Sequence, residues 1–155
     1  MTSRYAENTS VSTERSIGEI RSTLQRYGAT KFAYMKEEGR FQIAFEMRDR
    51  RIKFVLPLPN PSSKQFTHTP VKGDRRAPDK ALEAYEQACR QRYRALSLAV
   101  KAKLESVEAG IETFEQAFLA HIVLPNNQTV GEWAELQVEQ AYLSGKMPPL
   151  LMSGE

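Results

Sequence analysis

The residues best suited to chemistry are the arginines and the lysine of the run Arg48–Lys53. Guanidinium groups bind phosphate oxygens through paired hydrogen bonds, so this cluster favours contact with a polyanion. The hairpin register predicted below places Arg48 opposite Arg51, and two like charges across a strand pair are unfavourable unless an anion lies over them. The alternative explanation is a solvated hairpin tip, in which Glu46 opposite Lys53 gives partial compensation.

A second basic group falls on a long helix predicted at 78–107. With 100° of rotation per residue, its cations form two rows, and the members of the first row lie within about 40° of one another. The first row contains Arg90, Arg94 and Lys101, and the second contains Arg92 and Lys103. Such a helix face can lie beside a nucleic-acid backbone, although an ordinary solvated helix surface is the alternative.

The long segment 57–77 joins the two basic groups. It contains four prolines, which predict the end of a sheet and no helix. Phe66 and His68 could stack on unpaired bases, or Phe66 could pack into the core. The nucleic-acid-binding residues predicted from the three segments are Arg48, Arg50, Arg51, Lys53, Lys72, Arg75, Arg76, Arg90, Arg94 and Lys101.

Catalytic chemistry finds little support in the sequence. The two histidines, His68 and His121, are far apart along the chain, and His121 lies in an apolar run that predicts a buried or capping role. Cys89 lies on the apolar stripe of the long helix, where it fits the core better than a nucleophile. We therefore predict no catalytic residues, no cofactor and no metal site. A metal-dependent nuclease using Glu46 and Asp49 is a further alternative.

Charge is distributed unevenly along the chain. The net charge is +3 overall, with +1 in residues 1–39, +9 in residues 40–103 and −7 in residues 104–155. This polarity indicates a basic surface for an anionic partner and an acidic flank elsewhere. The acidic flank contains Glu105, Glu108, Glu112, Glu115, Glu132, Glu135 and Glu139.

Length and composition predict one globular domain. The chain has 155 residues, of which 41% are hydrophobic and 26% charged. The single cysteine fits a reducing compartment. The polar start, residues 1–12, differs from a signal peptide, and no apolar run approaches the roughly 18 residues of a membrane span. We expect a cytoplasmic protein with no membrane partner.

Periodicity predicts an α+β fold: a three-stranded antiparallel meander packed against a long helix, with an N-terminal helix and two C-terminal helices. The predicted organisation is a flexible N-terminus (1–11), one α+β domain (12–146) with the long basic loop (57–77), and a C-terminal tail (147–155), in which 147–151 is extended. The predicted helices are 12–27, 78–107, 113–122 and a last one that ends at 143. Ser12 caps the first helix and Gly28 ends it, while Thr129 and Glu132 form a capping box for the last. The predicted strands are 31–36, 40–48 and 51–58.

Turn residues set the predicted strand register. A turn at Glu38-Gly39 pairs Glu37 with Arg40, Tyr34 with Ile43 and Phe32 with Phe45. A turn at Asp49-Arg50 pairs Met47 with Ile52, Phe45 with Phe54 and Ile43 with Leu56. Both registers place the large apolar side chains on one face of the sheet.

The segments 31–59 (KFAYMKEEGRFQIAFEMRDRRIKFVLPLP) and 85–133 (YEQACRQRYRALSLAVKAKLESVEAGIETFEQAFLAHIVLPNNQTVGEW) carry a resemblance. Over residues 11–150 the chain resembles a family of small uncharacterised phage and prophage proteins. That resemblance implies a mobile-element context and, for a phage protein, the host cytoplasm. The order of helix, meander and long helix also resembles the core of Rad52-like single-strand annealing proteins, which bind DNA in a basic groove and assemble as rings or filaments.

Three hypotheses follow from these patterns. The leading one is a non-enzymatic nucleic-acid-binding protein of phage or prophage type, with DNA rather than RNA as the partner and single-strand binding or annealing as the activity. The second is a phage-encoded interaction protein that inhibits or modulates a host protein. The third is self-assembly into a homo-oligomer, because opposite charge blocks at the two ends of a chain permit head-to-tail contacts.

Overall fold

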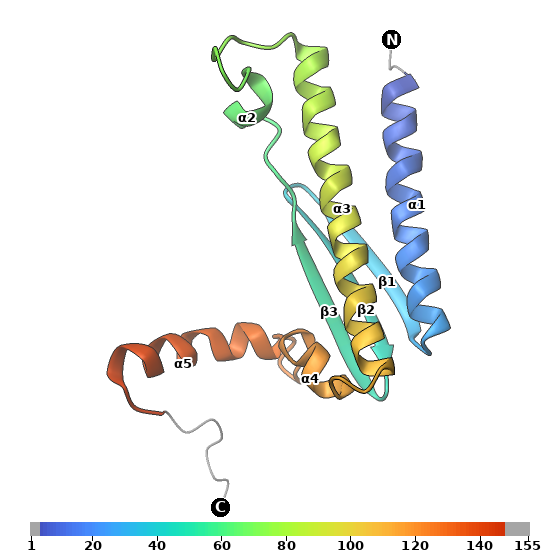
Figure 1. The fold of residues 1–155 in the computed structure, drawn as a ribbon, viewed down its shortest axis with the longest axis vertical. Helices are drawn as coiled ribbons and strands as arrows, with labels where there is room; N and C mark the ends of the chain where they lie inside the picture. The colour runs from blue at the N-terminus through green and yellow to red at the C-terminus, as the bar shows by residue number, and fades with distance from the viewer. Residues whose placement is uncertain (1–3, 148–155) are drawn as a thin grey trace, which may run out of the picture.

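The computed structural model describes residues 4–147, with side chains from Thr13 onwards. It confirms the predicted α+β fold, in which a three-stranded antiparallel sheet of order β1-β2-β3 carries α1 and α3 side by side on one face (Figure 1). The elements are α1 (Arg4–Arg26), β1 (Thr30–Glu37), β2 (Arg40–Met47), β3 (Arg50–Pro57), α2 (Lys64–Thr67), α3 (Pro78–Glu108), α4 (Phe114–Phe118), the 3₁₀ helix η1 (Leu119–His121) and α5 (Val130–Ser144).

The first hairpin has the predicted register over most of its length. Tyr34 pairs with Ile43 and Glu37 with Arg40, on either side of the Glu38-Gly39 turn. The register shifts between Thr30 and Ala33, and the predicted pairing of Phe32 with Phe45 falls in that irregular stretch. The edge strand β1 is therefore regular only in its second half.

The predicted register of the second hairpin is wrong by two residues. Phe45 pairs with Ile52 and Ile43 with Phe54, so the turn is Arg48-Asp49 rather than Asp49-Arg50. Both turn residues have left-handed backbone, with φ of 49° and 60°. Two left-handed residues match the twist of a two-residue hairpin, which explains why the chain turns one residue earlier.

This correction changes the cross-strand charge pairs but not the faces of the strands. Arg51 lies opposite Glu46, not opposite Arg48, and Lys53 lies opposite Ala44, not opposite Glu46. The unfavourable arginine pair predicted from the sequence does not form. Because side chains alternate with a period of two, a two-residue shift keeps every apolar residue on the core face.

The core lies between that face and the two long helices. Ile17, Ile20 and Leu24 of α1 are buried, and so are Cys89, Tyr93, Leu96, Val100 and Leu104, which form the apolar stripe of α3. The ring of Tyr93 meets the edge of Phe41 at 5.0 Å between centroids, and Cys89 is buried beside it. Towards the two ends of α3, Tyr85 and Val107 are partly buried against the core, and Leu82 is exposed.

Several element boundaries differ from the prediction. Helix α1 begins at Arg4, so Ser12 lies inside the helix and the predicted cap at Ser12 is wrong. Gly28, at φ 97°, follows it as predicted. The prolines of the loop do not forbid every helix, because one turn, α2, forms between Pro61 and Pro70.

The C-terminal helices have sharp caps. The predicted helix 113–122 is α4 followed by η1, and Thr113 forms a capping box with Gln116. Thr129 accepts a hydrogen bond from the Glu132 amide at 3.1 Å, as half of the predicted box. Gly145 ends α5 with left-handed backbone. The predicted extended tail lies almost entirely outside the described residues.

No helix within residues 4–147 combines the length and the apolar character that a membrane span requires.

Candidate nucleic-acid interface

The two arginines of the hairpin tip are docked on α4. Arg50 Nη2 lies 3.2 Å from Glu115 Oε1. The guanidinium carbon of Arg48 lies 5.5 Å from the ring centroid of Phe114, the geometry of a cation–π contact. Both partners belong to α4, so these two cations already serve the contact between the sheet and the C-terminal helices.

The next two cations of the strand point the opposite way. Ile52 and Phe54 are buried on the helix side, so Arg51 and Lys53 project from the other face of the sheet. Arg51 donates to Asn127 Oδ1 at 3.2 Å, and Lys53 Nζ lies 3.9 Å from Glu132 Oε1. The hairpin cations are thus divided between two faces, and each has a partner in the C-terminal part of the chain.

In the loop between β3 and α3, Arg76 has a structural role. Its backbone amide donates to the Thr67 carbonyl at 2.7 Å, and its guanidinium donates to the carbonyl of Phe66 at 3.1 Å. These bonds hold the loop closed on α2. Of the two alternatives for Phe66, the core position is the correct one, because the ring is buried edge-to-face against Tyr85 at 5.6 Å.

The same loop exposes two other cations. Lys72 and Arg75 are both exposed, and Arg75 pairs through its backbone with His68 on the opposite side of the loop. The His68 ring is half-buried, with Nδ1 2.7 Å from Thr67 Oγ1. The loop therefore offers positive charge to solvent, while its aromatic side chains are largely engaged.

The second row of α3 cations anchors the helix. Arg92 Nη1 donates to the Pro57 carbonyl at 3.3 Å, and Lys103 Nζ donates to the Ala117 carbonyl at 2.9 Å. These bonds tie α3 to the end of β3 and to α4. The sequence did not reveal this role, because the acceptors are backbone carbonyls that no side-chain pattern marks.

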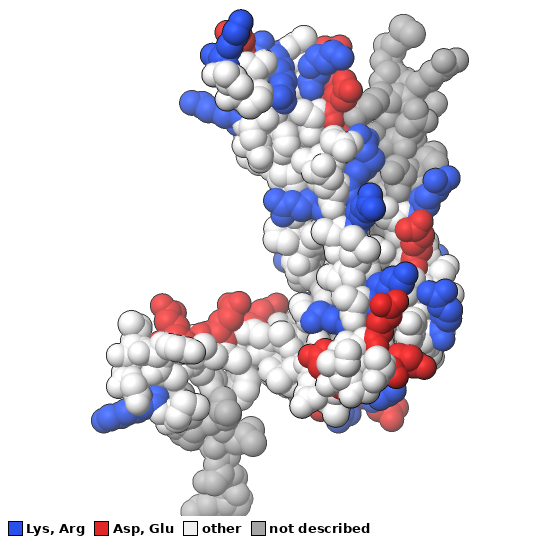
Figure 2. Space-filling view, in the orientation of Figure 1, with Lys and Arg blue, Asp and Glu red and all other residues white. Residues whose placement is uncertain are grey.

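The first row of α3 cations faces solvent. Arg94 and Lys101 are exposed, and Arg90 is half-buried with its Nε donating to Gln87 Oε1 at 3.2 Å. The sequence from Gln87 to Leu104 contains no acidic residue. Figure 2 shows basic side chains spaced along α3, with acidic side chains near both ends of this helix and along α5.

The structure does not bring all ten predicted residues into one patch. The β2–β3 turn lies at the C-terminal end of α3 and the basic loop at its N-terminal end (Figure 1). A helix of 31 residues is about 45 Å long, so the two ends are separate sites. The remaining exposed cations are Lys72 and Arg75 in the loop and the α3 row of Arg90, Arg94 and Lys101, with Asp79, Glu83 and Glu86 on the helix between them.

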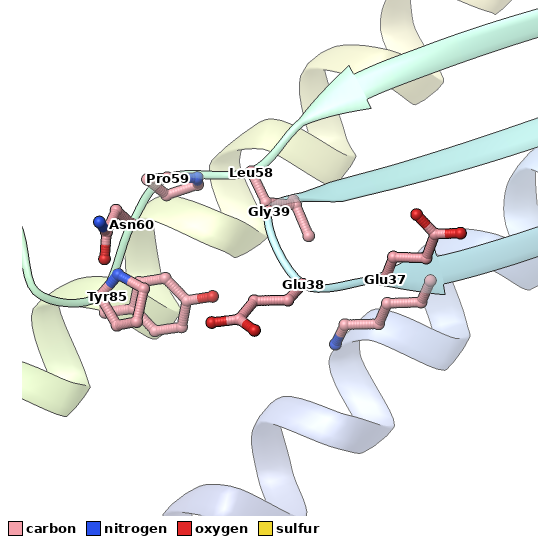
Figure 3. A pocket seen from close by; sticks show the side chains of 9 residues that line it. Glu37, Glu38, Gly39, Leu58, Pro59, Asn60 and Tyr85 are labelled. Carbon is pink, nitrogen blue, oxygen red and sulfur yellow. The ribbon is translucent and has the colours of Figure 1, made fainter.

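A groove of about 530 Å³ lies beside the loop, between the β1–β2 turn and the N-terminal half of α3. Its lining includes Glu37, Glu38 and Tyr85, and Figure 3 shows the Tyr85 hydroxyl directed towards Glu38. Burial, a hydrogen bond with Cys89 and nearby negative charge raise the pKa of Tyr85 to about 12. The groove thus presents a protonated hydroxyl beside carboxylates, which suits a phosphate poorly.

The last candidate for catalysis, His121, has a structural role in the fold. The ring of His121 stacks on Phe54 with centroids 3.9 Å apart. Burial and the charge of Lys103 lower the pKa of His121, although a hydrogen bond with the Lys53 backbone opposes them. No group of three or more His, Cys, Asp or Glu residues within the described part of the chain is placed to hold a metal ion. The nuclease hypothesis therefore finds no ligand set there.

Comparison of the chain with protein-family models, with curated proteins and with solved structures finds no match in any of the three.

Proposed function

We propose that this protein binds nucleic acid without catalysing a reaction, as a DNA-binding protein of phage or prophage type. The observation that supports the proposal is the α3 row of Arg90, Arg94 and Lys101 on a stretch of helix that contains no carboxylate. Lys72 and Arg75 add positive charge in the loop at the N-terminal end of the helix, beyond Asp79, Glu83 and Glu86. We call these five residues the α3 track.

The dimensions of the α3 track fit a phosphate backbone. Arg90 and Lys101 are eleven residues apart, or about 16 Å along the helix axis. Phosphates of one strand of B-form DNA recur about every 3.4 Å along the duplex axis, so the row spans about five of them. Long basic side chains on a helix can follow such a row without reading base edges.

The hairpin cations have no part in the proposed interface. Arg48, Arg50, Arg51 and Lys53 contact groups of the C-terminal elements, and two of them lie on the sheet face opposite α3. Within the loop, Phe66 is buried and cannot stack on a base. Binding should therefore depend on charge more than on sequence.

The test is a titration of labelled single-stranded and duplex DNA at two salt concentrations. Phosphate contacts release condensed counterions, so affinity for either substrate should fall steeply as salt rises. Mixing of complementary labelled strands then tests annealing, and a parallel titration with RNA tests the preference for DNA. Absence of salt-dependent binding at micromolar protein would rule the proposal out.

A further inference from the structure

Helix α5 carries an apolar surface that the rest of the described chain does not cover. None of its 15 residues is buried. Leu136 is 60% exposed and Tyr142 is 87% exposed. Other large apolar residues exposed on or just after this helix are Val138, Leu143 and Met147. A helix with this composition in water indicates a binding surface.

Contacts at the N-terminus of α5 fix its direction, so that the helix points away from its own sheet. The Val130 amide donates to the Ile122 carbonyl at 2.9 Å, and Ile122 itself pairs with Ile52 on the outer edge of β3. Gly131 packs so tightly on η1 that an added Cβ would lie 2.9 Å from the Ala120 carbonyl oxygen. Held in this way, α5 projects from the lower end of the body in Figure 1.

A second uncovered apolar surface lies on the sheet face opposite α1 and α3. Ala33 pairs with Ala44 there, and both are exposed. In the adjacent row Met35 and Val55 lie on either side of Gln42 and are 41% and 42% exposed. A sheet face with exposed Met, Val and Ala at its centre needs a cover in the same way as the core face does. We call these four residues the open sheet face.

The two surfaces match in length and in charge. Fifteen helical residues extend about 22 Å, and eight strand residues extend about 26 Å, so α5 can cross the open sheet face along its length. The border of that face carries four cations against two carboxylates. The cations are Lys31, Arg40, Arg51 and Lys53, and the carboxylates are Glu37 and Glu46. Lys31 pairs with Glu46 and Arg40 with Glu37, so Arg51 and Lys53 carry the excess positive charge.

Helix α5 carries the opposite charge. Glu135 and Glu139 lie within about 100° of Leu136 and Leu143 around the helix axis, whereas Glu132 already pairs with Lys53 of its own chain. Helix α5 contains no basic residue, and Lys146 lies beyond its C-terminal end. One side of α5 thus carries both leucines and carboxylates. This combination complements the open sheet face, which has apolar residues and a cationic border.

We infer that α5 packs across the open sheet face of a second copy of this chain, and that the second copy returns the same contact. Such a reciprocal arrangement is an isologous dimer, which closes with two copies. The α3 track lies on the other side of the sheet, so the dimer leaves it open on both copies.

The first test measures the molar mass of the full chain by light scattering after size exclusion, over a roughly hundredfold range of concentration. The natural chain should be a dimer, and Leu136→Glu or Val55→Glu should shift it to a monomer with unchanged circular dichroism. Ile111→Glu, which alters an exposed apolar residue outside both surfaces, is the matched control and should remain a dimer. An equimolar mixture of the two monomeric variants should partly recover dimers, because one intact α5 then meets one intact open sheet face.

The second test distinguishes exchange between copies from folding back within one copy. Ala44→Cys combined with Leu136→Cys, treated with a short bifunctional maleimide, should give a covalent dimer on a denaturing gel. The natural Cys89 is buried and serves as the background in the single variants. A monomeric natural chain at every concentration, including one that binds a host protein through α5 instead, would overturn the inference. So would a crosslink that forms only within one chain.

Discussion

Arg50 Nη2 lies 3.2 Å from Glu115 Oε1, so the turn of the second hairpin is joined to α4 by an ion pair. Both side chains are about half exposed, and a pair of this kind contributes about 0–1 kcal/mol to stability. The ion pair has a larger consequence for function. Arg50 was predicted from the sequence to bind phosphate, but in the fold its partner is the carboxylate of Glu115. This contact separates the hairpin cations from those of the α3 track.

The nucleic-acid proposal predicts a change in salt dependence on removal of two α3 cations. Arg94→Ala combined with Lys101→Ala should weaken DNA binding and flatten the slope of log affinity against log salt. The expected change is about 1.4 for single strands and about 1.8 for duplex, because each lost phosphate contact removes about 0.7 or 0.9. Fluorescence anisotropy at several salt concentrations measures it.

Arg48→Ala combined with Arg50→Ala is the matched control for this experiment, because it also removes two positive charges from the central part of the chain. We expect its salt slope to equal that of the natural protein, since Arg48 contacts Phe114 and Arg50 faces Glu115. Equal losses in the two variants would contradict the α3 track and would indicate attraction by net charge alone.

The position of the second turn predicts opposite effects of glycine at adjacent residues. Asp49 has left-handed backbone at φ 60°, so Asp49→Gly should raise the free energy of unfolding by about 0.5–1 kcal/mol. Arg50 is the first residue of β3, and Arg50→Gly should lower it by a similar amount. Urea denaturation of the two variants measures the difference, and the reverse order would restore the register that the sequence suggested.

The aromatic cluster at the lower end of the core should be sensitive to truncation. Phe118 is fully buried, with its ring edge-to-face against Phe45 at 6.3 Å and against Phe54 at 6.2 Å. Phe118→Ala should cost about 3–5 kcal/mol, the range for a large buried aromatic side chain. Its neighbour Leu119 is exposed, and Leu119→Ala should change stability by less than about 0.5 kcal/mol. Similar effects at the two positions in urea denaturation would show that α4 is not docked on the sheet.

We expect the substitution Tyr93→Phe to stabilise the protein. Its ring is buried, and its hydroxyl has no hydrogen-bond partner within the described part of the chain. An unpaired buried polar group costs about 1–3 kcal/mol, so Tyr93→Phe should raise the midpoint of thermal unfolding. Tyr34→Phe, at an exposed ring on the same side of the sheet, is the control and should leave the midpoint unchanged. A lower midpoint for Tyr93→Phe would mean that the hydroxyl is satisfied by water.

The dependence of stability on alkaline pH gives an independent test of the burial of Tyr93. Burial, with smaller contributions from Cys89 and Tyr85, raises the pKa of Tyr93 from 10.0 to about 12. Between these two values the unfolded chain loses the phenolic proton while the folded chain keeps it, so stability falls as pH rises. Tyr93→Phe should reduce this fall between about pH 10 and 12, which urea denaturation at a series of pH values can measure.

The order of elements and the core could be predicted from the sequence because both depend on local periodicity. The alternation in β2 and β3 fixed which side chains are buried, and a register error of two residues left Ile43, Phe45 and Phe54 on the correct face. The stripe of α3, including Cys89, was identified by helical spacing for the same reason. The turn was misplaced because Arg-Asp lacks the asparagine or glycine that usually marks left-handed backbone.

The cationic surface was decided by tertiary structure alone. The sequence shows ten basic residues of equal promise, but contacts between distant segments divide them. Arg50 meets Glu115, Arg51 meets Asn127 and Arg76 meets the Phe66 carbonyl, and none of these acceptors can be assigned before the chain is folded. The exposed apolar sides of α5 and of the sheet were also undecided, because a hydrophobic pattern shows that a face needs a cover and not which segment provides it. Periodicity is a property of neighbours along the chain, whereas charge pairing and coverage depend on neighbours in space.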